Sequence, residues 1–233
     1  MIVGVVIVGC VLLLVIAAVR KNGRHREELG RYAAALGGQL GWPSPQWISD
    51  NRPILNPYHK YADEKDAIHG KVSARDYVSF RTISEIQAVK LTKTVTTTLY
   101  YNGAAVGGIR SDLPPIDLLS TSGEWKPYFD GKSREGDRFA TGRVEFDRRF
   151  VLLANPADQA AARAMLTGEA MDALTLLSRI AGGPRIRIAQ GLVLCWIPGI
   201  TDIRANHEGY AAMLKALAMV ATTINLATGY PTR

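Results

Sequence analysis

An uncharged apolar run near the start of the chain is the feature that most constrains how this sequence folds. Residues 2–19 read IVGVVIVGCVLLLVIAAV, and thirteen of these eighteen residues are Val, Ile or Leu. Eighteen residues of α-helix rise about 27 Å, which is close to the thickness of the hydrocarbon layer of a bilayer. The sequence therefore predicts one membrane-spanning helix from Ile2 to Val19.

Two other interpretations of this run are a cleaved signal peptide and a lipoprotein signal, since Ile7-Val8-Gly9-Cys10 resembles a lipobox. A signal peptide carries basic residues ahead of its apolar core and small residues at its cleavage site. Here no basic residue precedes the run, and apolar sequence continues for nine residues beyond Cys10. A retained membrane anchor is therefore favoured over both.

The residues that follow the run are strongly basic. Residues 20–31 contain five basic and two acidic side chains, and they supply +3 of the net charge of +7. Basic flanks stay on the cytoplasmic side, so we expect the N-terminus outside and the domain on the cytoplasmic face of the cell membrane. Anionic headgroups attract such residues by about 1 kcal/mol each. The residues expected to contact them are Arg20, Lys21, Arg24 and Arg26.

The predicted organisation has three parts: an anchor over 1–20, a juxtamembrane helix and linker over 21–66, and a soluble α+β domain over 67–233. The apolar face of the juxtamembrane helix recurs at helical spacing and comprises Leu29, Tyr32, Ala33, Leu36 and Leu40. Residues 41–66 contain several prolines, so we expect a wrapping loop. Trp42 and Trp47 belong to this loop, and both membrane-interface placement and packing on the domain fit them.

Strand signals begin after this linker. Ile68 to Ala74 and Tyr77 to Ile83 are expected to pair around a turn at Arg75-Asp76. Val89 to Tyr101 is rich in β-branched residues and alternates in polarity, which is typical of a strand with one wetter face. Asn102-Gly103 is a strong two-residue turn signal, so we expect a second hairpin that returns over Ala104 to Arg110.

The C-terminal half mixes strands and helices. Arg143 to Ala154 is expected to be a strand. Asn155 and Thr167 are suitable N-caps for two helices over 157–182, and Gly182 is suited to end the second. Arg185 to Ala189 and Leu192 to Ile197 are expected to pair around Gln190-Gly191. A final helix from Ile203 to Ala227 contains polar residues, which favours a buried amphipathic helix over a second membrane span.

The predicted fold class is therefore α+β, with one N-terminal transmembrane helix followed by an antiparallel sheet. Two or three hairpins form the sheet. The helices over 157–182 and 203–227 cover one of its faces.

The common catalytic motifs are absent from the sequence. There is no P-loop, no GxGxxG and no GxSxG, and His207-Glu208 lacks the second histidine of HExxH. His59 and His69 flank Asp63, Glu64 and Asp66, a set that could form a metal site but reads more simply as a solvated loop. The Asp130–Asp137 loop lacks the spacing of a calcium site. We therefore predict no catalytic, cofactor-binding or metal-binding residues.

Two further features were candidates for chemistry. Cys195 lies in the apolar segment LVLCWI, which is typical of an inert buried thiol, and Cys10 lies too far away in the anchor to pair with it. Arg185 and Arg187 alternate with isoleucines, so they share one strand face. A solvated face is favoured there over an anion site.

The layout from Leu29 onward resembles actinobacterial single-pass membrane-anchored proteins of unknown function. The resemblance is carried by the basic juxtamembrane stretch, by Phe146-Asp-Arg-Arg-Phe150-Val, and by the Ala-rich and Leu-rich helices that follow. It implies the architecture above and no catalytic residues.

The leading hypothesis is a non-enzymatic binding or scaffolding module tethered to the cytoplasmic face of the membrane. Its expected partners are the lipid bilayer and other membrane proteins, with no cofactor. The alternative is a small-molecule or lipid-handling enzyme at the membrane surface that uses His59, His69 and the acids between them. Nucleic-acid binding is the weakest hypothesis, because the basic flank lacks interleaved aromatic residues.

Overall fold

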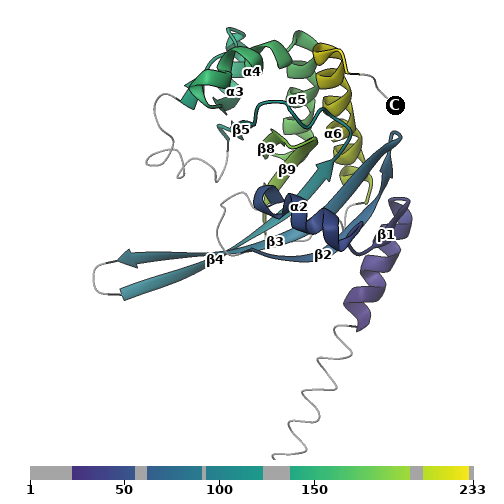
Figure 1. The fold of residues 1–233 in the computed structure, drawn as a ribbon. Helices are drawn as coiled ribbons and strands as arrows, with labels where there is room; N and C mark the ends of the chain where they lie inside the picture. The colour runs from purple at the N-terminus through teal and green to yellow at the C-terminus, as the bar shows by residue number, and fades with distance from the viewer. Residues whose placement is uncertain (1–22, 56–61, 91–92, 123–136, 200–206, 231–233) are drawn as a thin grey trace, which may run out of the picture.

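The computed structural model describes residues 23–55, 62–90, 93–122, 137–199 and 207–230, and Figure 1 shows the arrangement of their elements. Residues 23–35 are helical. In chain order there follow β1 (Gly38–Leu40), α2 (Pro45–Leu55), β2 (Ala62–Val72), β3 (Arg75–Lys90), β4 (Lys93–Val106), β5 (Ile116–Ser120), β6 (Arg138–Phe139), α3 (Val144–Arg149), β7 (Phe150–Leu153), a 3₁₀ turn (Pro156–Asp158), α4 (Gln159–Met165), α5 (Gly168–Ala181), β8 (Arg185–Ala189), β9 (Leu192–Pro198) and α6 (His207–Thr228).

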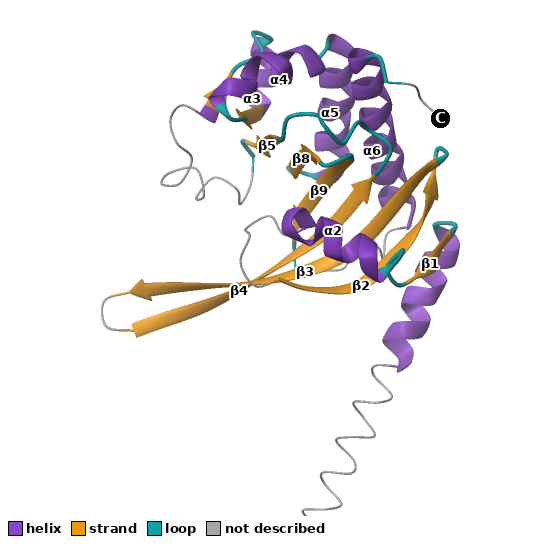
Figure 2. Ribbon diagram, viewed as in Figure 1, coloured by secondary structure: helices purple, strands orange, loops and turns teal. Residues whose placement is uncertain are grey.

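The strands form one nine-stranded sheet in the order β1-β2-β3-β4-β9-β8-β5-β7-β6. The pairings within it are antiparallel. The β8–β9 hairpin lies near the middle of the sheet and joins its N-terminal strands to β5, β7 and β6. Figure 2 shows β8 and β9 between β4 and β5. A pair that is distant in sequence, β4 with β9, therefore holds the two halves together.

The predicted fold class is wrong. In the described residues, the helix that is long and apolar enough to cross a membrane is not N-terminal but runs from Glu208 to Thr228, after the sheet. Half of its apolar window is buried against the rest of the molecule. This fits the expectation of a core helix. The predicted span from Ile2 to Val19 lies outside the described residues.

The sheet is also covered on both faces, not on one. Alternate residues of β9 point to opposite sides, so Val193 and Cys195 join one apolar cluster while Leu194 and Trp196 join another. The first cluster is larger and contains residues of the helix over 23–35, α5 and α6, and we call this side the helix-covered face. The second contains α2 and three tryptophans, and we call it the tryptophan face.

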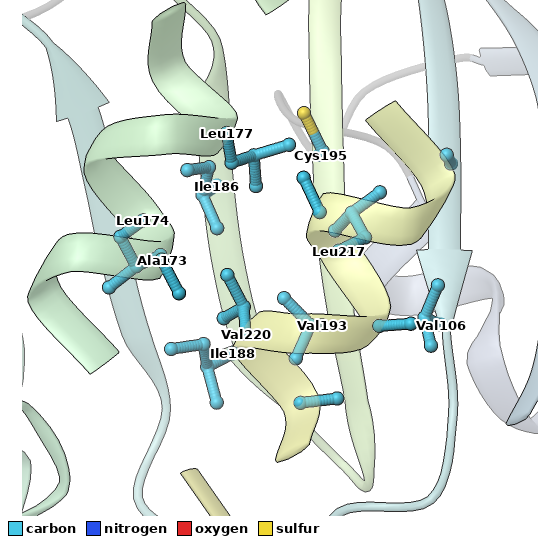
Figure 3. Packing of buried hydrophobic residues seen from close by; sticks show 14 of the residues in the cluster. Val106, Ala173, Leu174, Leu177, Ile186, Ile188, Val193, Cys195, Leu217 and Val220 are labelled. Carbon is cyan, nitrogen blue, oxygen red and sulfur yellow. The ribbon is translucent and has the colours of Figure 1, made fainter. Parts of the chain in front are cut away.

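The helix-covered face is packed mostly by aliphatic side chains. Figure 3 shows side chains of α5 and α6 meeting those of β4, β8 and β9. Leu174 and Leu177 of α5, and Leu217 of α6, are completely buried. This complete burial removes about 1.5–3 kcal/mol of unfavourable apolar hydration per side chain, which is why the two helices stay on the sheet.

The tryptophan face is packed by rings around a glycine. Trp196 is fully buried, and its indole nitrogen donates a 2.9 Å hydrogen bond to the carbonyl oxygen of Leu55 at the end of α2. The Trp42 ring lies 5.9 Å from that of Trp47 and 5.7 Å from that of Phe80. The tryptophans of residues 41–66 therefore pack on the domain.

The expected loop over 41–66 contains α2. The Ser44 hydroxyl accepts a 3.0 Å hydrogen bond from the amide of Trp47, as an N-cap does. Pro45 occupies the first helical position, where a missing amide hydrogen is harmless. The proline that suggests a loop is thus the residue that begins the helix.

The expected turn at Asn102-Gly103 is also wrong, because β4 runs straight through it. A Cβ atom built on Gly103 would lie 2.4 Å from the Phe80 ring on the neighbouring strand. The glycine therefore makes room for a ring and does not form a turn. The β3–β4 pairing extends instead as far as Lys90 and Lys93. The turn before β3 lies at Ser73 and Ala74, which both have positive φ, and not at Arg75-Asp76.

Several local predictions are confirmed. Asn155 accepts a hydrogen bond from the amide of Ala157, and Thr167 accepts one from that of Ala170. Gly182 ends α5 in the left-handed conformation, and β8 and β9 pair around Gln190-Gly191. The expected strand over 143–154 is half helix, because α3 precedes β7.

The hairpin of β3 and β4 extends beyond the strands that pair with it on either side. The β2 pairing of β3 ends at Ser84, and the β9 pairing of β4 begins at Tyr101. Among the described residues, 85–90 and 93–98 pair only with each other, so they form a two-stranded arm that projects from the domain in Figure 1.

Candidate functional site

The residues of the alternative enzyme hypothesis do not form a site in the described structure. Nδ1 of His69 donates a 2.9 Å hydrogen bond to the carbonyl oxygen of Gly41, which is a structural contact at the β1–β2 edge. Asp66 lies 3.1 Å from Nε2 of His25. His59 and the side chains of Asp63 and Glu64 lie outside the described part of the chain.

Metal and thiol chemistry gain no support from the described residues. Within them, no group of three or more His, Cys, Asp or Glu side chains lies close enough together to hold a metal ion. Burial raises the pKa of the Cys195 thiol well above its ordinary value, because the thiolate would lose its hydration. The thiol therefore stays protonated and unreactive at neutral pH.

Arg185 and Arg187 lie on the tryptophan face, where we expected a solvated surface. Both guanidinium groups meet the Asp117 carboxylate, at 3.0 Å and 3.4 Å, and all three side chains are at most 16% exposed. The Arg185 guanidinium also lies 5.9 Å from the centre of the Trp196 ring. Strand register explains this cluster, because β5 pairs with β8 and sets Asp117 opposite Arg187.

The helix over 23–35 is the described segment nearest to the predicted anchor, and its two sides differ. Leu29 and Ala33 are buried in the cluster of the helix-covered face. Arg24 and Arg26, both predicted to contact anionic lipid, are exposed. Arg20 and Lys21 lie outside the described residues. The helix is thus fixed to the domain by its apolar side. Its charged side faces solvent and carries Arg24, Arg26 and Arg31 together with Glu27 and Glu28.

A second contact also holds this helix. The His25 side chain reaches Asp66, which sits at an irregularity in β2 with a positive φ of 58°. A non-glycine residue pays a steric cost in this conformation, and the surrounding structure has to impose it. The irregularity turns the carboxylate toward the helix, so the basic side chains keep a defined orientation relative to the sheet.

A groove of about 230 Å³ lies between α3 and α5. These two helices lie at the end of the molecule opposite the helix over 23–35 (Figure 1). Sequence reasoning missed this groove, since α5 begins 19 residues after the end of α3 and neither helix carries a known motif. The lining residues are Arg143, Glu145, Phe146, Arg149, Asp172, Thr175, Leu176 and Arg179.

Local contacts fix the position of α3 beside this groove. The Asp147 carboxylate accepts hydrogen bonds from the backbone amides of Thr141 and Gly142, both at 3.0 Å, which sets the turn that enters the helix. Phe146 is 2% exposed, and its ring lies 5.0 Å from that of Phe150. These contacts anchor α3 in the core and leave its arginines at the surface.

The fold defines a class of protein: one antiparallel sheet, buried on both faces, with a long C-terminal core helix. No protein-family model matches the chain, and no curated protein matches it. A solved structure with this fold is the mycobacterial trehalose monomycolate transport factor A, TtfA. The TM-score is 0.52 at 14% sequence identity, and the match covers 88% of this chain and 97% of that chain. At this identity the likeness establishes a shared fold with an actinobacterial protein, as the sequence resemblance implied in coarser form.

Proposed function

We propose that this protein is a membrane-associated, non-enzymatic factor of lipid transport that works on the cytoplasmic face of the cell membrane. The observation that carries the proposal is the two-sided helix over 23–35. Its apolar side packs in the domain, and its exposed Arg24 and Arg26 lie five and seven residues beyond the apolar segment from Ile2 to Val19. Exposed arginines close to an apolar segment suit contact with anionic headgroups.

The shared fold supports the lipid part of the proposal. The neighbour of known structure is named as a transport factor for trehalose monomycolate, and almost its whole length matches this chain. The groove of about 230 Å³ is below the roughly 300–1,000 Å³ of sites that enclose drug-sized ligands. Among the described residues, this groove is therefore too small to enclose acyl chains.

Membrane association is tested by fractionation of cells that make the full chain. We expect the protein to stay in the membrane fraction after washes with high salt and carbonate, and to need detergent for release. The single-pass topology predicts that a Glu169→Cys probe, at an exposed position of α5, reacts with an impermeant reagent only after lysis. Recovery in the aqueous fraction, or labelling of intact cells, would contradict the proposal.

The role in lipid transport is tested in the bacterium of origin. Depletion of the protein should leave a newly made envelope lipid accumulated in the inner membrane, as measured by radiolabelling and fractionation of the envelope layers. Complementation by the Arg24→Gln, Arg26→Gln variant should be weaker than by the unchanged chain. The control is Arg31→Gln on the same helix, which removes one positive charge that is already paired with Glu27 at 3.2 Å, and it is compared with Arg24→Gln alone. An unchanged lipid distribution would refute the role.

A further inference from the structure

The groove between α3 and α5 carries positive charge that the described structure does not neutralise. Arg143 is paired, because its guanidinium lies 2.7 Å from the Asp172 carboxylate and also donates to the carbonyl oxygen of Gly168. Within the described residues, Arg149 and Arg179 form no ion pair or hydrogen bond through their side chains. Two guanidinium groups on facing helices thus line one groove without an acidic partner.

Guanidinium chemistry points to an oxyanion with several acceptor oxygens. The planar fork of an arginine binds phosphate through two parallel hydrogen bonds, which are stronger than neutral ones because they are charge-assisted. Arginines from two helices can approach one phosphate from two sides. Leu176 lines the same groove and is 42% exposed, so it offers an apolar wall beside the two charges.

The remaining lining residue with a charge is Glu145, which has no ion pair within the described part of the chain. A carboxylate accepts hydrogen bonds, so it favours a ligand that carries hydroxyl groups beside its anion. It also disfavours binding of a second anionic group. A phosphate ester of a small hydroxylated molecule satisfies both sets of side chains.

We propose that this groove binds the phosphate group of a small hydroxylated phosphate ester, held by Arg149 and Arg179 with Glu145 accepting from a hydroxyl group. The volume of about 230 Å³ suits a ligand of this size. The groove lies at the end of the molecule away from the helix over 23–35 (Figure 1), so it faces away from the proposed membrane contact. A soluble ester therefore fits its position better than a headgroup of the same bilayer. The site goes beyond the proposed function, and only the choice of a soluble ester over a lipid headgroup rests on it.

The test is calorimetric titration of the purified full chain, held in an uncharged detergent, with glycerol 3-phosphate at low salt. The double variant Arg149→Gln, Arg179→Gln should bind at least about tenfold more weakly, since each lost charge-assisted contact contributes that much or more. Arg148→Gln is the control for the single variant Arg149→Gln: it removes one positive charge from the same helix, at an exposed position that does not line the groove. We expect less than a twofold change for it.

Two further variants separate phosphate recognition from general attraction. Arg149→Lys with Arg179→Lys keeps both charges but loses the forked geometry, so its affinity should fall between those of the unchanged chain and the glutamine variant. Glu145→Gln should weaken glycerol 3-phosphate more than inorganic phosphate, because inorganic phosphate lacks the carbon-bound hydroxyls. Thermal unfolding followed by circular dichroism confirms that each variant is folded before its binding is compared.

The source of the phosphate is decided by a second titrant, dihexanoyl phosphatidic acid, in the same detergent. Binding of glycerol 3-phosphate that depends on Arg149 and Arg179 supports the site with a soluble ligand. Binding of the phosphatidic acid alone, with the same dependence, supports the phosphate site with a lipid source. Failure to bind either compound, or an equal loss in the Arg148→Gln control, overturns the proposal. None of these results depends on whether the chain fractionates with membranes, so the two proposals fail separately.

Discussion

The two faces of the sheet are both buried, but side chains of different kinds cover them. On the helix-covered face, α5 and α6 press aliphatic side chains onto β4, β8 and β9, and Leu174, Leu177 and Leu217 are completely buried. On the tryptophan face, the fully buried Trp196 and Phe80 share the space beside Gly103 under α2. The helix-covered face is stabilised by close packing of aliphatic side chains. The tryptophan face needs the space left by Gly103 and the hydrogen bond from Trp196 to Leu55.

This difference explains why the segment LVLCWI reads as uniformly apolar although it is a single strand of an antiparallel sheet. The side chains on each side of this strand are buried in a separate apolar cluster, so neither side requires polar residues. It also predicts unequal responses to substitution. The helix-covered face should be sensitive to the removal of atoms, and the tryptophan face to their addition.

The largest expected effect is on the helix-covered face. Leu217→Ala should lower the free energy of unfolding by about 4 kcal/mol, because a fully buried leucine is replaced by a cavity between α6 and the sheet. Urea denaturation followed by circular dichroism measures the change. Leu226→Ala is the matched control on the same helix: Leu226 is 62% exposed, so its loss should cost less than about 0.5 kcal/mol. Similar costs for the two substitutions would mean that α6 is not a core helix.

The next effect is the opposite kind of change on the tryptophan face. Gly103→Val should destabilise by about 3 kcal/mol, because its side chain would overlap the Phe80 ring. Combining it with Phe80→Ala should cost less than the sum of the two single substitutions, since the smaller residue vacates the same space. Gly107→Ala is the control, because a Cβ atom there meets its neighbours at the ordinary distances of 3.6 Å and 3.7 Å. Additive costs in the double variant would show that the glycine does not accommodate the ring.

The sequence predicted those features whose cause is local. The caps at Asn155 and Thr167, the end of α5 at Gly182 and the β8–β9 turn each depend on a few adjacent residues. The buried state of Cys195 and the buried Leu29 and Ala33 of the juxtamembrane helix are as expected. The predicted apolar face of that helix extended too far, because Leu40 lies in β1 and is 44% exposed.

The features that the sequence did not predict have distant causes. Asn102-Gly103 is a turn signal in isolation, and what keeps it in a strand is Phe80, which lies on another strand. The pairing of β4 with β9 joins residues about ninety positions apart, so no hairpin pattern reveals it. The two groove arginines are also distant in sequence. Arg149 ends α3, and Arg179 lies in the last turn of α5, after β7 and α4. Only the fold brings α3 beside α5.

A smaller effect tests the hydrogen bond of the tryptophan face. Trp196→Phe should lower the free energy of unfolding by about 2 kcal/mol, because the carbonyl oxygen of Leu55 loses its donor in a buried place. Trp47→Phe on the same face is the control, since Trp47 is only partly buried, and its cost should be smaller. Urea denaturation at one wavelength in the far ultraviolet avoids interference from the lost fluorescence. Equal costs would show that ring packing, and not the hydrogen bond, dominates this face.

The helix-covered face also holds a buried titratable group, which makes its stability depend on alkaline pH. The pKa of Cys195 is raised in the folded state by desolvation, so above the unfolded pKa of about 8.5 the unfolded chain loses a proton that the folded chain keeps. Stability is fully present below that pH and falls as the pH rises. At pH 9.5 the loss should be about 1.4 kcal/mol. Urea denaturation at pH 7.5 and 9.5, in a chain with Cys10→Ser, measures it. The additional Cys195→Ala substitution should abolish this loss, and a persistent loss would assign it to other groups. Tyr77, whose pKa burial also raises, contributes only above about pH 10.

The smallest expected effect concerns α5, which contributes side chains both to the core and to the groove. Thr167→Ala should destabilise by about 1 kcal/mol, because the Thr167 hydroxyl accepts a 3.3 Å hydrogen bond from the amide of Ala170 at the start of α5. Thr167→Ser retains the acceptor and should cost only a few tenths of a kcal/mol. Since Leu174 and Leu177 hold α5 in the core, the loss of its cap should loosen the first turn while the rest of the helix stays packed. Hydrogen exchange of the amides in the first turn should therefore accelerate more than exchange around Leu177. Uniform acceleration along α5 would mean that the helix opens as one unit and that the helix-covered face has little stability beyond its caps.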